Sequence, residues 1–209
     1  PRPQVVKAQG WVDRQLAQKL VIVNPGSADQ VDVLEGLCWL MLNRYVVARQ
    51  DVEARNTRLG TVPDWLATGV AQSLFISLRA RNSHVVLKRW QRGEAMELED
   101  LLALEYLPDG RWAEKAFCGA VVDWLAEWPR ANELFSAMLD RRARRERITA
   151  DWLGQRITGS AQAREAEKAW SLWIAQQSNV KRQLGGATEE DLQALGNLMK
   201  VRPEEFGIT

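Results

Sequence analysis

Histidine and cysteine, the residue types that most often carry chemistry, are scarce in this chain of 209 residues. The sequence holds one histidine, His84, and two cysteines, Cys38 and Cys118. A cysteine nucleophile needs a nearby base, and His84 is the only histidine that could serve. Because Cys38 lies in a strongly apolar stretch, which raises the pKa of a thiol, we expect a core cysteine there. A hydrolase with Cys38 as its nucleophile is kept as the alternative.

Metal binding is not expected from these three residues either. The separations between Cys38, His84 and Cys118 match no common zinc-ligand spacing. One histidine cannot form a paired-histidine zinc motif anywhere in the chain. We therefore predict no metal and no other cofactor, identify no small-molecule substrate, and expect two buried thiols in preference to a disulfide.

A run of arginines is the strongest charge feature. Five of seven consecutive residues are arginine: Arg141, Arg142, Arg144, Arg145 and Arg147. Such a run can grip phosphates or an acidic protein, although basic residues at a helix C-terminus also suit the helix dipole. No aromatic residue interrupts the run to stack on bases. We expect a solvated tract, and as an alternative an acidic-partner binder, with nucleic acid the less favoured partner.

Bulk composition excludes several classes of protein. The chain has 28 basic and 27 acidic residues, so nothing global attracts a polyanion. Its apolar stretches are interrupted within about ten residues, which is too short for a transmembrane segment. With 46% hydrophobic residues and ten tryptophans, the chain can form a sizeable core.

Periodicity predicts a mostly helical domain with a small β element at its start. Residues 1–23 hold two β-branched clusters and end in turn residues, which indicates two strands. Residues 30–50 are apolar on most faces, as is typical of a central helix, and 49–61 read as a surface loop. The segment 85–87 is ambiguous between strand and helix. Further helices are predicted over 63–81, 98–106, 112–128, 129 to the arginine run, 148–157, 161–177 and 188–202.

These elements predict an α+β fold, predominantly α-helical. We place a main domain at 1–184 and a C-terminal helical appendage at 185–209, because Gly185-Gly186 separates the last helix from the rest.

The nonapeptide that opens the second helix carries the most specific pattern. It reads Pro63-Asp64-Trp65-Leu66-Ala67-Thr68-Gly69-Val70-Ala71 and follows strands, a long apolar helix and a loop. Pro63 suits the first turn, and Gly69 indicates a close approach to a neighbouring helix. This order resembles the gluzincin metallopeptidases, most closely the bacterial peptidase MA-like group. That group carries His-Glu-x-x-His on the first helix and Trp-Leu-x-Glu-Gly-x-Ala on the second.

The chain departs from the family pattern at every metal position. Its first helix has apolar residues where ligands would lie, and Thr68 stands at the third-ligand position. A neutral hydroxyl is a poor zinc ligand, and without the metal no activated water is available. The resemblance therefore implies a degenerate former site, at Cys38, Trp39, Leu42 and Thr68.

The function implied by this resemblance is that of a pseudoenzyme. We expect a zincin-like domain that is not an enzyme and acts as a protein-binding or structural module, with a protein partner or self-assembly. Domains of this group are often exported in bacteria, so the resemblance also implies an envelope or periplasmic location.

Overall fold

The computed structural model describes residues 4–12, 15–27, 29–50, 61–107 and 111–184. The chain divides into two compact units, Pro1–Ile174 and Ala175–Thr209. The predicted helix at 188–202, the boundary after residue 184 and most of the 49–61 loop involve residues outside the described ranges, and they stay predictions.

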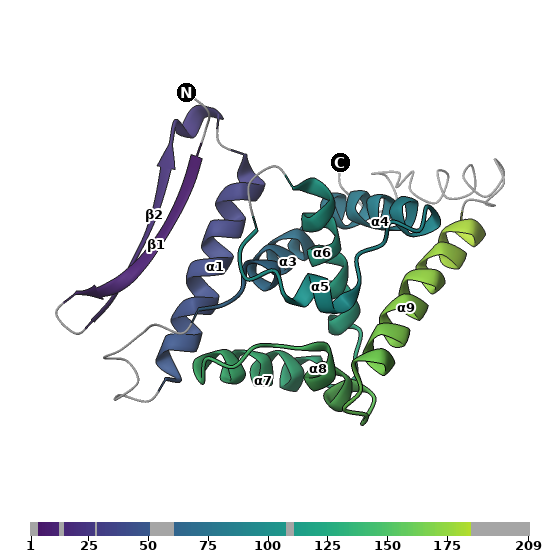
Figure 1. The fold of residues 1–209 in the computed structure, drawn as a ribbon. Helices are drawn as coiled ribbons and strands as arrows, with labels where there is room; N and C mark the ends of the chain where they lie inside the picture. Colours follow the sequence, from purple (N-terminus) through teal and green to yellow (C-terminus); the bar gives the residue numbers. More distant parts are fainter. Residues whose placement is uncertain (1–3, 13–14, 28, 51–60, 108–110, 185–209) are drawn as a thin grey trace, which may run out of the picture. The chain divides into compact units, whose positions relative to one another are not determined.

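An antiparallel hairpin begins the fold, which confirms the two predicted strands. Strand β1 (Gln4–Val12) pairs with β2 (Gln15–Val23) in a two-stranded sheet, with Val6 opposite Val21. A short 3-10 helix, Pro25–Ser27, follows. The hairpin lies along helix α1 (Figure 1).

Helix α1 (Gln30–Ala48) joins the hairpin to the helical core. Asp29 caps it by accepting a hydrogen bond of 2.9 Å from the backbone nitrogen of Val31. A Cβ added to Gly36 would press against the side chain of Leu20 on β2, so the glycine lets the strand approach closely.

The predicted helix at 63–81 is two helices, which corrects the sequence prediction. Helix α3 (Asp64–Leu74) stops at Phe75, whose backbone is extended at φ −105° and ψ 121°, and α4 (Ile76–Gln91) begins directly after it. The ambiguous segment 85–87 is helical within α4. The apolar row of α3 continues past the break without Gly or Pro, so no local signal marks the break.

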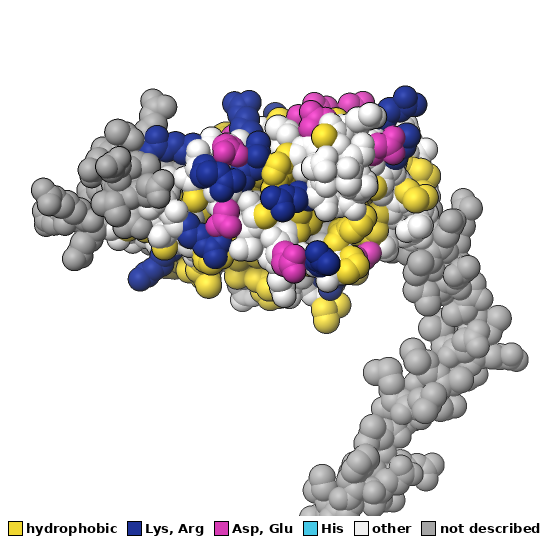
Figure 2. Space-filling view, turned by 90° about the horizontal axis from the view of Figure 1, so that it is seen from below, with side chains coloured by type: hydrophobic (Ala, Val, Ile, Leu, Met, Phe, Trp, Pro, Cys, Tyr) yellow, Lys and Arg dark blue, Asp and Glu magenta, His cyan; other side chains and the backbone are white. Residues whose placement is uncertain are grey.

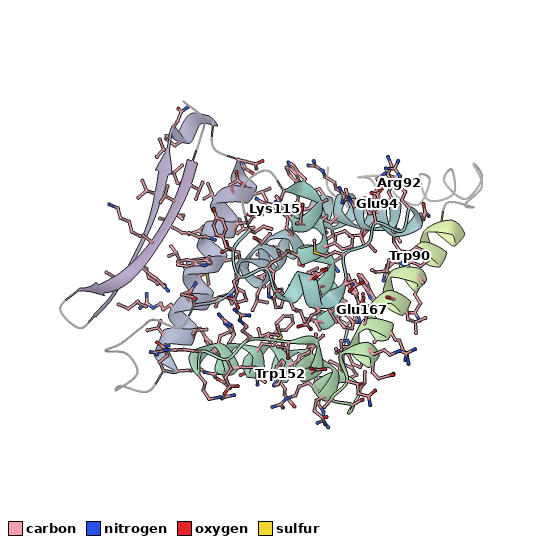
Figure 3. The ribbon with its side chains drawn as sticks, in the orientation of Figure 1. Trp90, Arg92, Glu94, Lys115, Trp152 and Glu167 are labelled. Atoms are coloured by element: carbon pink, nitrogen blue, oxygen red, sulfur yellow. The ribbon has the colours of Figure 1, made fainter. Side chains whose placement is uncertain are left out.

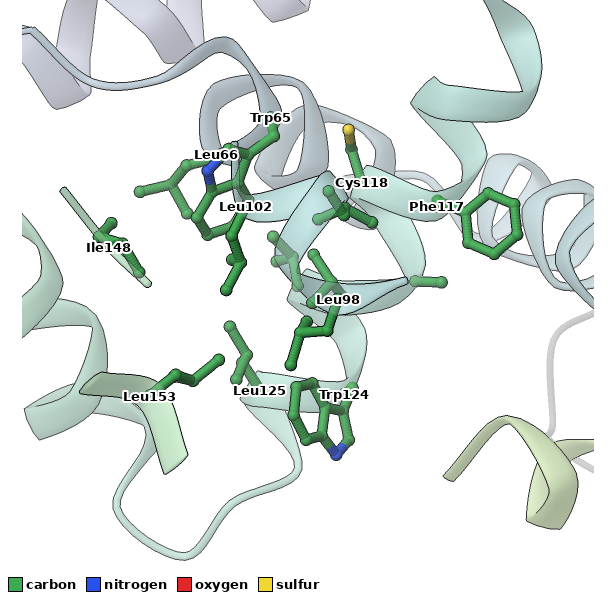
Figure 4. Packing of buried hydrophobic residues seen from close by; sticks show 14 of the residues in the cluster. Trp65, Leu66, Leu98, Leu102, Phe117, Cys118, Trp124, Leu125, Ile148 and Leu153 are labelled. Carbon is green, nitrogen blue, oxygen red and sulfur yellow. The ribbon is translucent and has the colours of Figure 1, made fainter. Parts of the chain in front are cut away.

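Helix α6 (Trp112–Ala126) is the centre of the core. It contacts α3 and α4 extensively and also touches the short helix α5 (Leu98–Leu102). The close approach expected at Gly69 is present: a Cβ there would collide with the backbone carbonyl of Cys118 on α6. Figure 4 shows the apolar side chains of this region, including Leu98, Phe117 and Leu125.

Three further helices complete the described part: α7 (Ala131–Ala143), α8 (Ala150–Ile157) and α9 (Ala163–Leu184). Carboxylates from other helices cap helix N-termini, where free N–H groups need acceptors. Glu167 accepts a hydrogen bond from the Leu98 nitrogen at 2.7 Å, and Glu99 accepts one from the Ala150 nitrogen at 2.9 Å. The acidic residues around α5 therefore include structural caps.

Tryptophans pin α9 to α6. Trp170 is buried against Trp124 with ring centroids 5.4 Å apart, and it stacks on Trp173 at 5.5 Å. The indole nitrogen of Trp173 donates to Glu127 at 2.7 Å. These contacts hold the first half of α9 against α6.

The fold is thus mostly helical with a small N-terminal antiparallel sheet. Cys38 and Cys118 are buried free thiols, as predicted. Among the described residues, no helix is long and apolar enough to cross a membrane.

Candidate functional site

The junction of α1 and α3 holds the residues expected to form the former site. The two helices pack together, and both Cys38 and Thr68 are buried. Leu42 is partly buried against the core. Trp39 instead meets the hairpin, where the Lys7 ammonium lies 5.2 Å from its ring centroid. The predicted set is therefore split between the α3 side and the hairpin side of α1.

A polar cluster crosses the same junction, and it was missed at the sequence level. We define it as Glu35, Gln72, Asn82 and Lys115, from α1, α3, α4 and α6, together with the exposed Asp32. The Lys115 ammonium donates to Glu35 Oε2 at 2.8 Å and to Asp32 Oδ1 at 3.2 Å. Gln72 donates to Glu35 Oε1 at 2.9 Å and accepts from Asn82 at 3.0 Å. One connected network thus ties four helices together.

The carboxylates of the polar cluster stabilise the charged form of Lys115. Burial by itself lowers the pKa of Lys115, but the carboxylates of Glu35 and Asp32 outweigh it and raise this pKa above its usual value. The lysine stays charged because two carboxylates face it. Figure 3 labels Lys115 on α6, close to α1.

The nearby thiols are poor nucleophiles. Burial, followed by the charge of Glu35, raises the pKa of Cys38. Burial raises the pKa of Cys118 further, and Glu35 acts in the same direction. His84 lies exposed on α4, and no hydrogen bond links it to Cys38 in the described part of the chain. Cysteine chemistry needs a thiolate, which these surroundings disfavour.

The donor set does not fit the zinc ion of the family. No three His, Cys, Asp or Glu side chains gather within the described residues in a way that could hold a metal. Thr68 offers a neutral hydroxyl, and the Cys38 thiol keeps its proton. The positive charge at this junction comes from Lys115.

Asp64 of the nonapeptide has a structural role. Its carboxylate accepts from Lys7 on β1 at 2.6 Å and from the Leu107 backbone at 3.0 Å. Buried Asn43 on α1 accepts from the Val62 backbone at 2.9 Å. The start of α3 is therefore fixed to both the hairpin and α1.

The arginine run is partly built into the fold. Arg142 is buried and makes a bidentate pair with Glu105, at 3.0 and 2.9 Å, and it also donates to the Thr61 carbonyl at 2.9 Å. Arg141 and Arg144 both pair with Glu146, at 2.8 and 3.1 Å.

Arg145 and Arg147 complete this set and are exposed after the end of α7. Arg145 has a positive φ of 65° in the turn. Figure 2 views the molecule from the side of α7 and α8, where basic and acidic side chains are interspersed. The five arginines thus do not present one uniform basic surface, and a partner-binding role for them stays a prediction.

A surface pocket of about 410 Å³ lies elsewhere, beside the turn between α6 and α7 and the end of α8. Trp128 and Pro129 form part of its wall, with Arg130 and Arg156 among its polar residues. None of the predicted site residues lines it.

A weak sequence signal could have pointed to the polar cluster. Glu35 is the only acidic residue between Asp32 and Asp51, in a mostly apolar helix. A charge within such an apolar stretch indicates a buried partner. The partner itself, Lys115, lies 80 residues away and gives no signal of its own.

Comparison with protein-family models, curated proteins and solved structures finds no significant match to this chain. The arguments about function therefore rest on the residues themselves.

Proposed function

We propose that this chain is a non-catalytic, peptidase-like domain that serves as a protein-binding or structural module. The observation that carries the proposal is the ion pair of Lys115 with Glu35 at the α1–α3 junction. The Lys115 ammonium binds a carboxylate oxygen of Glu35 that a catalytic base would need free to accept a proton.

The family pattern gives this ion pair its meaning. One helical turn before the former site named from the sequence, the spacing His-Glu-x-x-His also fits Leu34-Glu35-Gly36-Leu37-Cys38. In this earlier register, which replaces the one through Trp39 and Leu42, the glutamate is kept while both histidines are replaced. In a zinc peptidase this glutamate accepts a proton from metal-bound water. Both oxygens of Glu35 instead accept hydrogen bonds from side chains, of Lys115 and Gln72. This supports a non-catalytic scaffold in which the glutamate stabilises the packing of the helices.

The outer face of α1 supports a binding role. Leu37, Met41 and Tyr45 follow one another at four-residue spacing on that face, and all three are exposed. Such a row can receive a partner helix or a second copy of the chain. The alternative of a Cys38 hydrolase is not favoured, because burial raises the pKa of that thiol.

A first experiment measures metal and activity together. The purified protein should contain far less than one equivalent of zinc by mass spectrometry and should leave unstructured peptides uncut. Stoichiometric zinc that EDTA removes, with loss of peptide cleavage, would overturn the proposal.

Rebuilding the ligand set tests the peptidase-like arrangement itself. The triple variant Leu34→His, Cys38→His, Thr68→Glu restores the family's ligands in the Leu34–Cys38 register, and we expect it to bind Co²⁺ with the visible spectrum of a tetrahedral site. The control variant Leu37→His, Met41→His places two histidines at the same spacing on the outer face of α1, without a third ligand. If both variants bind Co²⁺ equally weakly although both remain folded, the peptidase-like arrangement is refuted.

Self-assembly is tested by sedimentation. If copies associate through the α1 row, Leu37→Asp with Met41→Asp gives monomers, while Leu172→Asp on exposed α9 leaves the association unchanged. A wild-type monomer at all concentrations would leave a different protein as the partner and would exclude self-assembly.

A further inference from the structure

The junction between α3 and α4 exposes three consecutive apolar side chains. Ile76 is 84% exposed and Leu74 is 61% exposed, with Phe75 between them also exposed. Phe75 is extended, so the backbone turns here and the three residues form a tip. Consecutive large apolar residues are rarely left in water unless they serve an interaction.

The helix that follows this tip carries an unbalanced positive charge. Residues 65–93 contain no Asp or Glu, while five basic residues lie between Ile76 and Gly93. Arg81, Lys88 and Arg92 are all exposed, and their spacing of seven and four residues places them on one face of the helix. The row extends about 16 Å along the helix axis at 1.5 Å per residue.

These three basic residues are available for an external partner. In the described part of the chain no carboxylate pairs with Arg81, Lys88 or Arg92, whereas Arg79 is paired with Asp123 at 3.1 Å. Figure 3 shows Arg92 near the end of α4, where its side chain points away from the core. The nearest acidic residue along the chain is Glu94, just beyond the helix.

An exposed tryptophan lies against the basic row. Trp112, at the start of α6, is 43% exposed, and the Arg81 guanidinium lies 3.9 Å from its ring centroid. An indole with an apolar body and a polar edge is favoured where hydrocarbon meets water.

We propose that this surface, made of Leu74, Phe75, Ile76, Trp112 and the basic face of α4, docks on a lipid bilayer with anionic headgroups. The apolar tip would enter the boundary between headgroups and acyl chains, and the arginines and lysine would face lipid phosphates. A nucleic acid would use the basic row but would leave the apolar tip without a partner. The docking surface is separate from the α1 row, so it does not depend on the proposed module function.

Vesicle flotation tests the proposal with the full chain. We expect binding to vesicles of 70% phosphatidylcholine and 30% phosphatidylglycerol, weak binding to pure phosphatidylcholine, and loss of affinity as salt rises. Ile76→Asp should weaken binding at least tenfold, because an apolar anchor is replaced by a charge that anionic lipid repels. Its control is Leu172→Asp, at an exposed leucine of α9.

Charge is tested separately from apolar insertion. Lys88→Gln with Arg92→Gln should weaken binding more than tenfold, since each basic residue near an anionic surface contributes about fivefold. Arg130→Gln with Arg164→Gln removes two exposed charges from other helices and should leave binding within about threefold, an allowance for the weaker effect of distant charges.

Insertion is detected directly with a fluorophore. Ile76→Cys can be labelled with an environment-sensitive dye because both native thiols are buried. A blue shift should appear with the anionic vesicles, and the Leu172→Cys label should show none. The proposal fails if wild type does not float with anionic vesicles, or if Ile76→Asp floats as well as wild type. It also fails if double-stranded DNA binds and loses affinity only in the charge variant, since the partner would then be a nucleic acid.

Discussion

Replacing Lys115 with methionine removes the ammonium from the polar cluster while keeping an unbranched side chain. Glu35 is then left with one partner, Gln72, in a position where its side chain is only 13% exposed. Removing one member of a fully buried ion pair destabilises a protein by about 3–5 kcal/mol. Because some water reaches both partners and Asp32 is exposed, we expect a loss of about 2–3 kcal/mol.

A double-mutant cycle separates the ion pair from packing. Glu35→Gln alone should lose about 1–2 kcal/mol, because Lys115 keeps Asp32 and Gln72 keeps an acceptor. The double variant Glu35→Gln, Lys115→Met should be more stable than the sum of the two losses implies, with a coupling energy of about 1–2 kcal/mol. Urea unfolding followed by tryptophan fluorescence at pH 7 measures each term.

The pH dependence follows from the raised pKa of Lys115. A group whose pKa is higher in the folded state stabilises fully below its unfolded pKa, about 10.4 for lysine. That stabilisation is lost as pH rises through the folded pKa. The difference in free energy of unfolding between wild type and Lys115→Met should therefore be constant from pH 7 to 9 and become smaller above about pH 10.4.

An exposed ion pair provides the control. Lys168 pairs with Glu165 at 2.6 Å on the surface of α9, and Lys168→Met should change stability by less than about 0.5 kcal/mol. If Lys115→Met is as mild as this control, or if the cycle shows no coupling, the polar cluster does not brace the four helices.

Three further predictions concern single residues. Gly69→Ala should destabilise by at least about 2 kcal/mol, because its Cβ meets the backbone carbonyl of Cys118, which cannot rotate away; thermal unfolding measures this. Arg142→Lys should lose about 2–3 kcal/mol in urea unfolding, because an ammonium cannot keep the bidentate contact with Glu105. Burial raises the pKa of Glu167, so the protonated side chain stabilises the fold most below the ordinary carboxyl pKa, and this stabilisation is lost as pH rises. In urea unfolding, the stability of Glu167→Gln relative to wild type should therefore increase between pH 4 and 7.

Matched exposed positions provide the comparisons. Gly26→Ala has open space around the new methyl group, so it should be nearly neutral. Arg130→Lys and Glu133→Gln change side chains of the same types at strongly exposed positions. If Gly26→Ala or Arg130→Lys loses as much stability as its test variant, or if Glu133→Gln shows the same pH-dependent gain as Glu167→Gln, burial and partner geometry do not explain the effects.

Local signals predicted much of the fold. The β-branched clusters predicted the two strands, and apolar periodicity with caps located α1 and most later helices. The break at Phe75 was missed because it follows from packing. The hydrogen bond between Asn82 and Gln72 requires α4 to turn away from the line of α3. Tertiary contacts of this kind override the local apolar row.

The candidate site was harder to predict, because its members come from distant segments. Periodicity tells which face of a helix is buried, but it does not pair Glu35 with a lysine on another helix. The same reason explains why Arg142 was predicted within an exposed run. Its carboxylate partner, Glu105, precedes it by 37 residues. The five arginines therefore look alike in the sequence, although in the fold Arg142 alone among them is buried.

If the proposed peptidase-like scaffold is correct, a lysine stands where a metal would brace the junction, and this changes how the scaffold responds to its surroundings. A metal-braced junction depends on metal supply and loses its brace in chelators, because metal binding is coupled to folding. The ammonium of Lys115 is covalently part of the chain and stays charged across physiological pH, since its pKa is raised. The proposed module should therefore keep its helices together without a cofactor. Its contacts with partners then depend only on outward-facing surfaces, and the α1 row and the α4 surface can be changed without touching the polar cluster.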